Sequence, residues 1–137
     1  MKFVFASMAR EFVRVADGTY ELRGIQRAML CALPLRMPVL LFVSLVGRKD
    51  EPRREMKLGV ELIHEGGTRL LAFEATHSDQ STQLDRLRWN DITINLGDVT
   101  FPWHGEYEFQ VSLDGIVVGS ALYYLGPMPA DGDAALG

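Results

Sequence analysis

The segment from residue 106 to residue 125 constrains the fold of this chain more than any other part of it. Apolar residues occupy every second position of its first half, the period of a strand with one buried face: Tyr107, Phe109, Val111 and Leu113. Asp114-Gly115 then supplies a turn that accepts positive φ, and Ile116–Leu125 is apolar enough to return as the second strand. The segment therefore predicts a β-hairpin.

The same signals predict two more hairpins. One joins Met56–Leu62 to Arg69–Thr76 through Glu65-Gly66-Gly67, and the other joins Glu11–Val15 to Thr19–Gln26 through Ala16-Asp17-Gly18. Residues 77–87 show no strand period, so we expect a crossover loop with at most one helical turn there. A further strand is expected over residues 92–96, ending at Gly97-Asp98.

Two strands are apolar in both phases of their alternation. These strands are Lys2–Ala9 and Val39–Val46. Val117-Val118 and Leu122–Leu125 add further apolar residues beyond those that one two-sheet core needs. A strand of this kind is buried on both sides. A helix, a loop or a partner subunit must therefore cover the second side, which makes a homodimer the first expectation.

Eight or nine short strands separated by turns predict an all-β fold. We expect a single-domain antiparallel β-sandwich, Ig-like or jelly-roll-like, over residues 1–125. Residues 126–137 combine Pro, Gly and Ala without any period, so a disordered C-terminal tail is expected there. Tyr107, two residues after Gly105, is placed like a tyrosine corner, although a Tyr that only fills the core would fit as well.

Composition narrows the class of partner and the compartment. The 137 residues carry a net charge of −4, and this mild acidity argues against nucleic acid and anionic membranes, which select clustered Lys and Arg. The lone Cys31 forms no internal disulfide, which favours the reducing cytoplasm. The most apolar run, Met37–Gly47, is shorter than the roughly 20 residues of a membrane-spanning helix.

No motif in the chain carries catalysis or holds a cofactor. There is no Gly-x-Ser-x-Gly elbow, and Cys31 lies in an apolar stretch that suppresses thiol reactivity. The three histidines, His64, His77 and His104, lack the spacing that places two metal ligands on one face. Asp79, Asp91 and Asp98 could supply oxygen ligands, but Asp and His residues in loops are more often solvated. We therefore predict a protein that is not an enzyme and has neither a metal site nor a cofactor.

Paired carboxylates occur once along a predicted strand. Glu106 and Glu108 share the polar face of the strand whose other face is core. General acid and base pairs also share a face, but we interpret these two as solvated charges on an edge strand, where they discourage unwanted pairing.

Three residues suggest a binding site as an alternative. Trp89 precedes a strand, and Trp103 and His104 form the corner before Tyr107. Exposed indoles on sandwich loops stack on sugars and other small molecules. A Trp beside Pro102 at a sheet corner can equally plug the end of the core, and both interpretations stay open.

The order of these landmarks resembles a family of short bacterial all-β proteins known only as a domain of unknown function. The landmarks are Lys2–Phe5, Asp17–Ile25, Pro38–Leu41, His104–Phe109 and Leu113–Gly115. The resemblance spans residues 2–125 and implies a single all-β domain, but it transfers no functional residue.

Three functions are compatible with this reading. The first is a non-catalytic interaction module that associates with itself or serves as an accessory protein-binding subunit. The second is a small-molecule or carbohydrate-binding sandwich with its site near Trp103 and His104. The third is a structural subunit of a virion or filament, which the architecture allows although no residue selects it.

Overall fold

The structure, a computed structural model, describes residues 1–16, 19–52, 54–78 and 82–129. Within these ranges the chain is all β, with no helix, and hence none long and apolar enough to cross a membrane. The strands are β1 (Lys2–Met8), β2 (Glu11–Ala16), β3 (Thr19–Arg23), β4 (Ala28–Leu30), β5 (Leu35–Arg48), β6 (Glu55–His64), β7 (Arg69–Ser78), β8 (Thr82–Leu84), β9 (Leu87–Phe101), β10 (Gly105–Leu113) and β11 (Ile116–Gly126).

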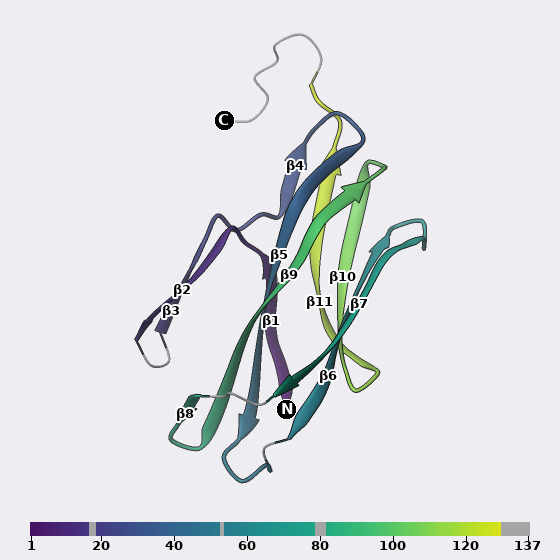
Figure 1. The fold of residues 1–137 in the computed structure, drawn as a ribbon. Helices are drawn as coiled ribbons and strands as arrows, with labels where there is room; N and C mark the ends of the chain where they lie inside the picture. The colour runs from purple at the N-terminus through teal and green to yellow at the C-terminus, as the bar shows by residue number, and fades with distance from the viewer. Residues whose placement is uncertain (17–18, 53, 79–81, 130–137) are drawn as a thin grey trace.

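These strands form three sheets (Figure 1). A four-stranded sheet has the order β1-β5-β9-β8, a five-stranded sheet the order β4-β11-β10-β6-β7, and β2 and β3 pair only with each other. The two larger sheets contribute to one hydrophobic core, in which Phe101 of β9 contacts Tyr107 of β10 and Tyr123 of β11 at ring centroid distances of 5.0 and 5.7 Å. β1 lies beside β11, where the Phe3 ring fills the space that a side chain at Gly119 would need.

The three hairpins predicted from the sequence are confirmed. β10 pairs antiparallel with β11, β6 with β7, and β2 with β3, whose turn residues 17–18 lie outside the described ranges. Asp114 and Gly115 turn the chain with φ of 50° and 84°, the left-handed backbone that this dipeptide favours. The apolar phase of β10 is buried as the alternation indicates.

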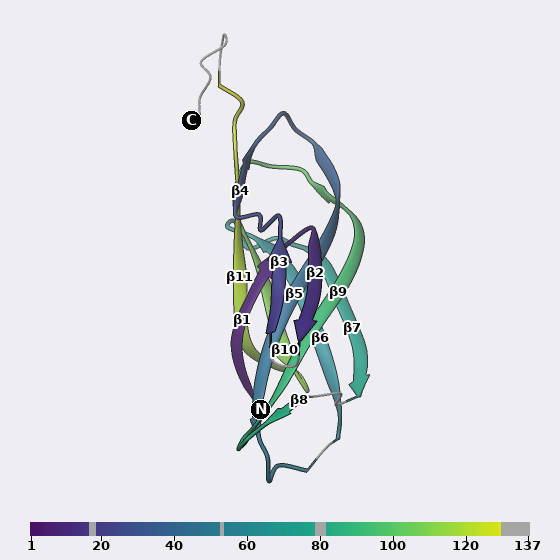
Figure 2. The ribbon, with the colours of Figure 1, turned by 90° about the vertical axis from the view of Figure 1, so that its left-hand side faces the viewer.

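The second face of β5 is covered by the chain itself. β2 and β3 lie across the four-stranded sheet, in front of β5 in the view of Figure 2. Phe12 and Tyr20 of this hairpin contact the Phe42 ring at centroid distances of 5.1 and 5.0 Å. Phe42 is thereby 1% exposed. This correction removes β5 from the case for a homodimer, because a hairpin rather than a helix, a loop or a partner subunit covers it.

The described residues form eleven strands where eight or nine were expected. β4 and β8 contain three residues each, too few to show a period, and they exist because β11 and β9 pair with them. The crossover loop predicted for residues 77–87 is wrong for its described part, since β7 continues to Ser78, β8 occupies 82–84 and β9 begins at Leu87. Residues 79–81 lie outside the described ranges.

The last strand is tied to the segment that follows β4. β11 ends at Gly126, whose carbonyl accepts a hydrogen bond from the Cys31 amide at 3.0 Å. The prediction of a disordered tail falls mainly on residues 130–137, which are outside the described part of the chain.

Candidate functional site

The connection from β9 to β10 is held by the hydroxyl of Tyr107. The amide of Trp103 donates to this oxygen at 3.1 Å, and the hydroxyl donates to the Trp103 carbonyl at 2.6 Å. Burial raises the pKa of Tyr107, so the hydroxyl keeps its proton for the second bond. These hydrogen bonds are those expected of a tyrosine corner, which is one of the two interpretations that the position of Tyr107 after Gly105 left open.

His64, at the end of β6, packs beneath this corner. Its ring lies 5.3 Å from the Trp103 ring and 4.9 Å from the Tyr107 ring, measured between centroids. Nε2 lies 2.8 Å from the His104 carbonyl, and Nδ1 accepts from the Gly66 amide at 3.3 Å. A carbonyl only accepts, so these partners assign the neutral tautomer with the proton on Nε2. Because both ring nitrogens hold backbone groups, His64 is a positioning residue rather than a free base.

The structure brings together two of the three predicted ligand-binding residues. Trp103 and His104 adjoin at the corner, where Trp103 is 44% exposed and His104 Nε2 donates to the Cys31 carbonyl at 3.0 Å. Trp103 is therefore no buried plug. Trp89 pairs with Val46 near the other end of β9, roughly 40 Å away along the strand. It does not join the other two.

The two buried tyrosines of this region make a matched prediction. Tyr123 is fully buried, its hydroxyl has no partner among the described residues, and burial raises its pKa to about 12. We expect Tyr123→Phe to stabilise the fold by about 1 kcal/mol and Tyr107→Phe to destabilise it by about 1–2 kcal/mol. Urea unfolding of both variants measures the difference, and equal effects of the same sign would contradict these hydrogen-bond assignments.

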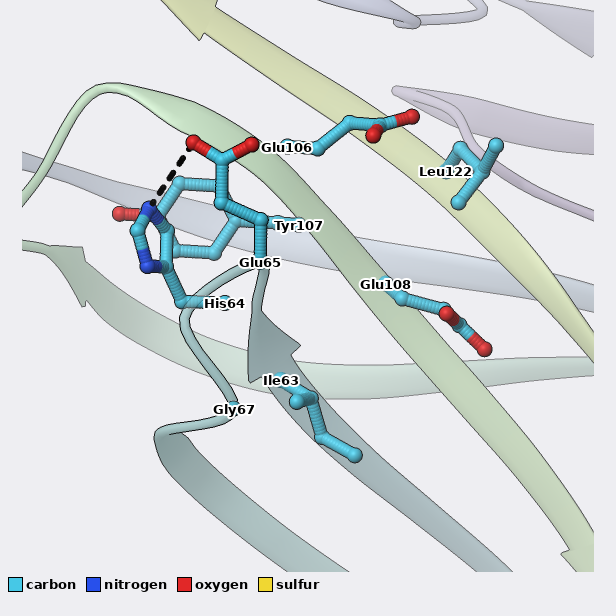
Figure 3. Close-up of a pocket in the computed structure, with 8 residues that line it drawn as sticks. All are labelled: Ile63, His64, Glu65, Gly67, Glu106, Tyr107, Glu108 and Leu122. Atoms are coloured by element: carbon cyan, nitrogen blue, oxygen red, sulfur yellow. Dashed lines mark ion pairs between the residues drawn. The ribbon is translucent and has the colours of Figure 1, made fainter.

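A hollow of about 210 Å³ opens beside the corner, on the outer face of the five-stranded sheet (Figure 3). It is lined by Ile63, His64, Glu65, Gly67, Glu106, Tyr107, Glu108 and Leu122. Strand register arranges the outward side chains in two rows. One row is Ile63, Glu108 and Leu122, and the other is Glu65, Glu106 and Tyr124. We call these six residues the acidic-apolar face.

The negative charge on this face is not balanced by a Lys or Arg of the described residues. Other carboxylates of the same sheet are paired. Arg69, which lies opposite Ile63 in β7, pairs with Glu61 at 3.2 Å, and Lys57 pairs with Glu74 at 4.0 Å. Neither Glu106 nor Glu108 forms an ion pair with a described residue, and Glu65 has only the His64 ring, at 3.9 Å.

Glu65 and Glu106 are also neighbours across two strands, since the Glu65 amide donates to the Glu106 carbonyl at 2.8 Å. Like charges in adjacent positions of this kind destabilise a sheet. The interpretation of Glu106 and Glu108 as charges protecting an edge is wrong, because β10 lies between β11 and β6.

The histidines and aspartates considered as metal ligands are not gathered in the structure. No group of three or more His, Cys, Asp or Glu side chains in the described ranges is arranged to hold a metal ion. The His64 ring donates to the His104 carbonyl, the His104 ring donates to the Cys31 carbonyl, and His77 lies in β7 opposite Met56. Asp91 accepts from Ser44 at 2.8 Å, Asp98 pairs with Arg36 at 3.5 Å, and Asp79 is outside the described residues.

Residues 12–124 match the model of a "Family of unknown function (DUF6941)". The chain belongs to this family. The match confirms the resemblance to a domain of unknown function. The DUF6941 region begins within β2 and ends within β11, so it includes the acidic-apolar face and the tyrosine corner but not β1. A search of curated proteins finds no match to the chain.

Sequence reasoning found part of this site. The pattern identified Glu106 and Glu108 as a pair on one strand face and Leu122–Leu125 as a segment that is apolar on both faces. Glu65 was expected only in a turn, and His64 was considered only as a metal ligand. The signal that could have located the site is the pair Leu122 and Tyr124. These side chains lie on the outward face of a strand whose inward residues are buried in the core.

Proposed function

We propose that this protein is a non-catalytic β-sandwich interaction module, Ig-like or jelly-roll-like, that binds another polypeptide through the acidic-apolar face. A cytoplasmic location, which the single reduced cysteine favours, is part of the proposal. The sandwich arrangement is supported by the core that the two larger sheets share.

One observation carries the proposal. Leu122 is 59% exposed and Tyr124 is 47% exposed, side by side in the outward phase of β11. No described element covers them, in contrast with the second face of β5, which a hairpin covers. Adjacent exposed apolar and aromatic side chains are typical of interfaces, where Tyr often contributes a large share of the binding energy.

Site-specific photocrosslinking in source cells tests this function. A photoreactive phenylalanine at position 122 is expected to give a discrete covalent adduct, whereas the same group at Thr100, an exposed position on β9, is not. An adduct of two copies indicates self-association, a ladder of multiples indicates a filament, and an adduct with another chain indicates an accessory subunit. Absence of an adduct at position 122, or equal labelling at both positions, would refute the proposal.

A second candidate function is small-molecule or carbohydrate binding at the corner. The observation in its favour is the half-exposed indole of Trp103, whose ring centroid lies 5.3 Å from that of His64, a residue that lines the hollow. Titration with simple sugars would then change the intrinsic fluorescence in the wild type and in Trp89→Phe but not in Trp103→Phe. An unchanged spectrum in the wild type removes this candidate.

A further inference from the structure

We infer that the occupant of the acidic-apolar face is a basic segment of another protein, one that presents two Arg or Lys side chains about 7 Å apart. This inference rests on the proposed function and adds the chemistry of the partner.

The acidic-apolar face carries a local excess of negative charge. Three carboxylates, those of Glu65, Glu106 and Glu108, line one hollow without a Lys or Arg partner among the described residues. Glu65 and Glu106 are adjacent across the strands, an arrangement that costs stability in the free protein. Cations from a partner would remove this repulsion, so binding is favoured by an electrostatic term that the isolated domain lacks.

The spacing of two carboxylates along β10 matches that of an extended peptide. Glu106 and Glu108 are two positions apart on one strand, so their side chains project to the same side at a separation of about 7 Å (Figure 3). Side chains two positions apart in an extended partner strand have the same spacing. A segment lying along β10 would therefore place two cations over the two carboxylates.

Apolar side chains flank the carboxylates of Glu106 and Glu108. Glu108 lies between Ile63 and Leu122 in its row, and Glu106 lies beside Tyr124. The methylene stems of Arg and Lys pack on aliphatic side chains while their charged ends reach a carboxylate. Arg additionally stacks on a tyrosine ring, which favours Arg over Lys at the Glu106 position.

A second copy presenting the same face is disfavoured by the same residues. Symmetric pairing would bring the Glu65, Glu106 and Glu108 carboxylates of both copies together, and such like-charge contacts are a strong barrier to association. The apolar surplus of β11 therefore indicates a different protein rather than a symmetric homodimer.

Calorimetric titration of the full-length protein with defined peptides tests the inference. The probe is a short capped peptide in which arginine alternates with threonine, and the comparison peptides carry lysine or glutamate in place of arginine. We expect the arginine peptide to bind most tightly, the lysine peptide less tightly and the glutamate peptide not at all, with binding that weakens as salt is added. Spermidine serves as a further probe, and equally tight binding of this small polycation would overturn the assignment to a protein segment.

Matched variants locate the binding. Glu106→Gln combined with Glu108→Gln is expected to weaken arginine-peptide binding by about tenfold. Glu11→Gln combined with Glu21→Gln removes the same net charge from the β2–β3 hairpin, where both residues neighbour Arg23, and is expected to leave binding almost unchanged. Equal effects of the two double variants would overturn the inference.

The free protein should respond in the opposite direction. Glu106→Gln removes a like charge from the position beside Glu65, so we expect its Tm to rise by about 1–2 °C while peptide affinity falls. A purely structural role for Glu106 would instead lower the Tm on substitution.

The failures are distinguishable. A position-122 adduct together with no arginine-peptide binding would overturn the basic partner and leave the interaction module standing. A symmetric dimer of the wild type in sedimentation, lost on Leu122→Ser, would do the same. Absence of both the adduct and peptide binding would overturn both proposals.

Discussion

Phe42→Ala is expected to destabilise the protein by about 3–5 kcal/mol, the usual cost of removing a buried phenylalanine. Phe42 is 1% exposed and its ring lies against Phe5, Phe12 and Tyr20 at centroid distances of 5.9, 5.1 and 5.0 Å. Two of these contacts join the β2–β3 hairpin to the four-stranded sheet. The substitution should therefore also loosen the hairpin before the rest of the domain unfolds.

Hydrogen exchange separates the two effects. In Phe42→Ala we expect the amides of β2 and β3 to lose more protection than those of β10. Phe109→Ala is the control, because Phe109 is equally buried in β10 and has no ring contact with the hairpin. It should lower global stability similarly without selective loss in the hairpin. Equal protection patterns in the two variants would mean that Phe42 does not anchor the hairpin.

Gly105→Ala is the second large effect, expected at about 2–4 kcal/mol of lost stability. Gly105 has φ of +121°, a region that residues with a Cβ rarely adopt. A Cβ there would overlap the carboxylate of Glu65 and lie 2.9 Å from Nε2 of His64. The change therefore disturbs the corner and the acidic-apolar face together.

Gly115→Ala provides the matched control for this prediction. Gly115 also has positive φ, at +84°, but nothing lies within 4 Å of an added Cβ. Its cost of about 1 kcal/mol reports backbone conformation alone. Urea unfolding should place Gly105→Ala well above this value, and a similar cost for both variants would show that the corner has room to relax.

Much of the fold follows from local sequence. The alternation of β10, the Asp114-Gly115 turn and the placement of Tyr107 each depend on residues within a few positions of one another. The hairpin matches its prediction, and the two hydrogen bonds of Tyr107 favour the corner over a Tyr that only fills the core. The strands β4 and β8 were not predicted. Each has only three residues, which is too short to show an alternation, and each is defined by the strand that pairs with it.

Only part of the candidate site could be predicted, because the rest depends on which strands pair. The outward phase of β10 and β11 identifies Glu106, Glu108, Leu122 and Tyr124 as exposed. It does not show that β6 lies on the other side of β10, which brings Ile63 and Glu65 into the same two rows. Sequence reasoning also took β10 for an edge strand, and the strand order alone corrects that.

The sequence by itself determined that this chain is all β and which side chains of β10 face inward, because the two-residue period of a strand is a local property. Only the tertiary structure decided which outward faces meet. It covered the apolar second face of β5 with the β2–β3 hairpin and left that of β11 open beside three carboxylates. The physical reason is that neighbouring strands in a sheet come from distant parts of the chain, so their adjacency depends on the packing of the whole core.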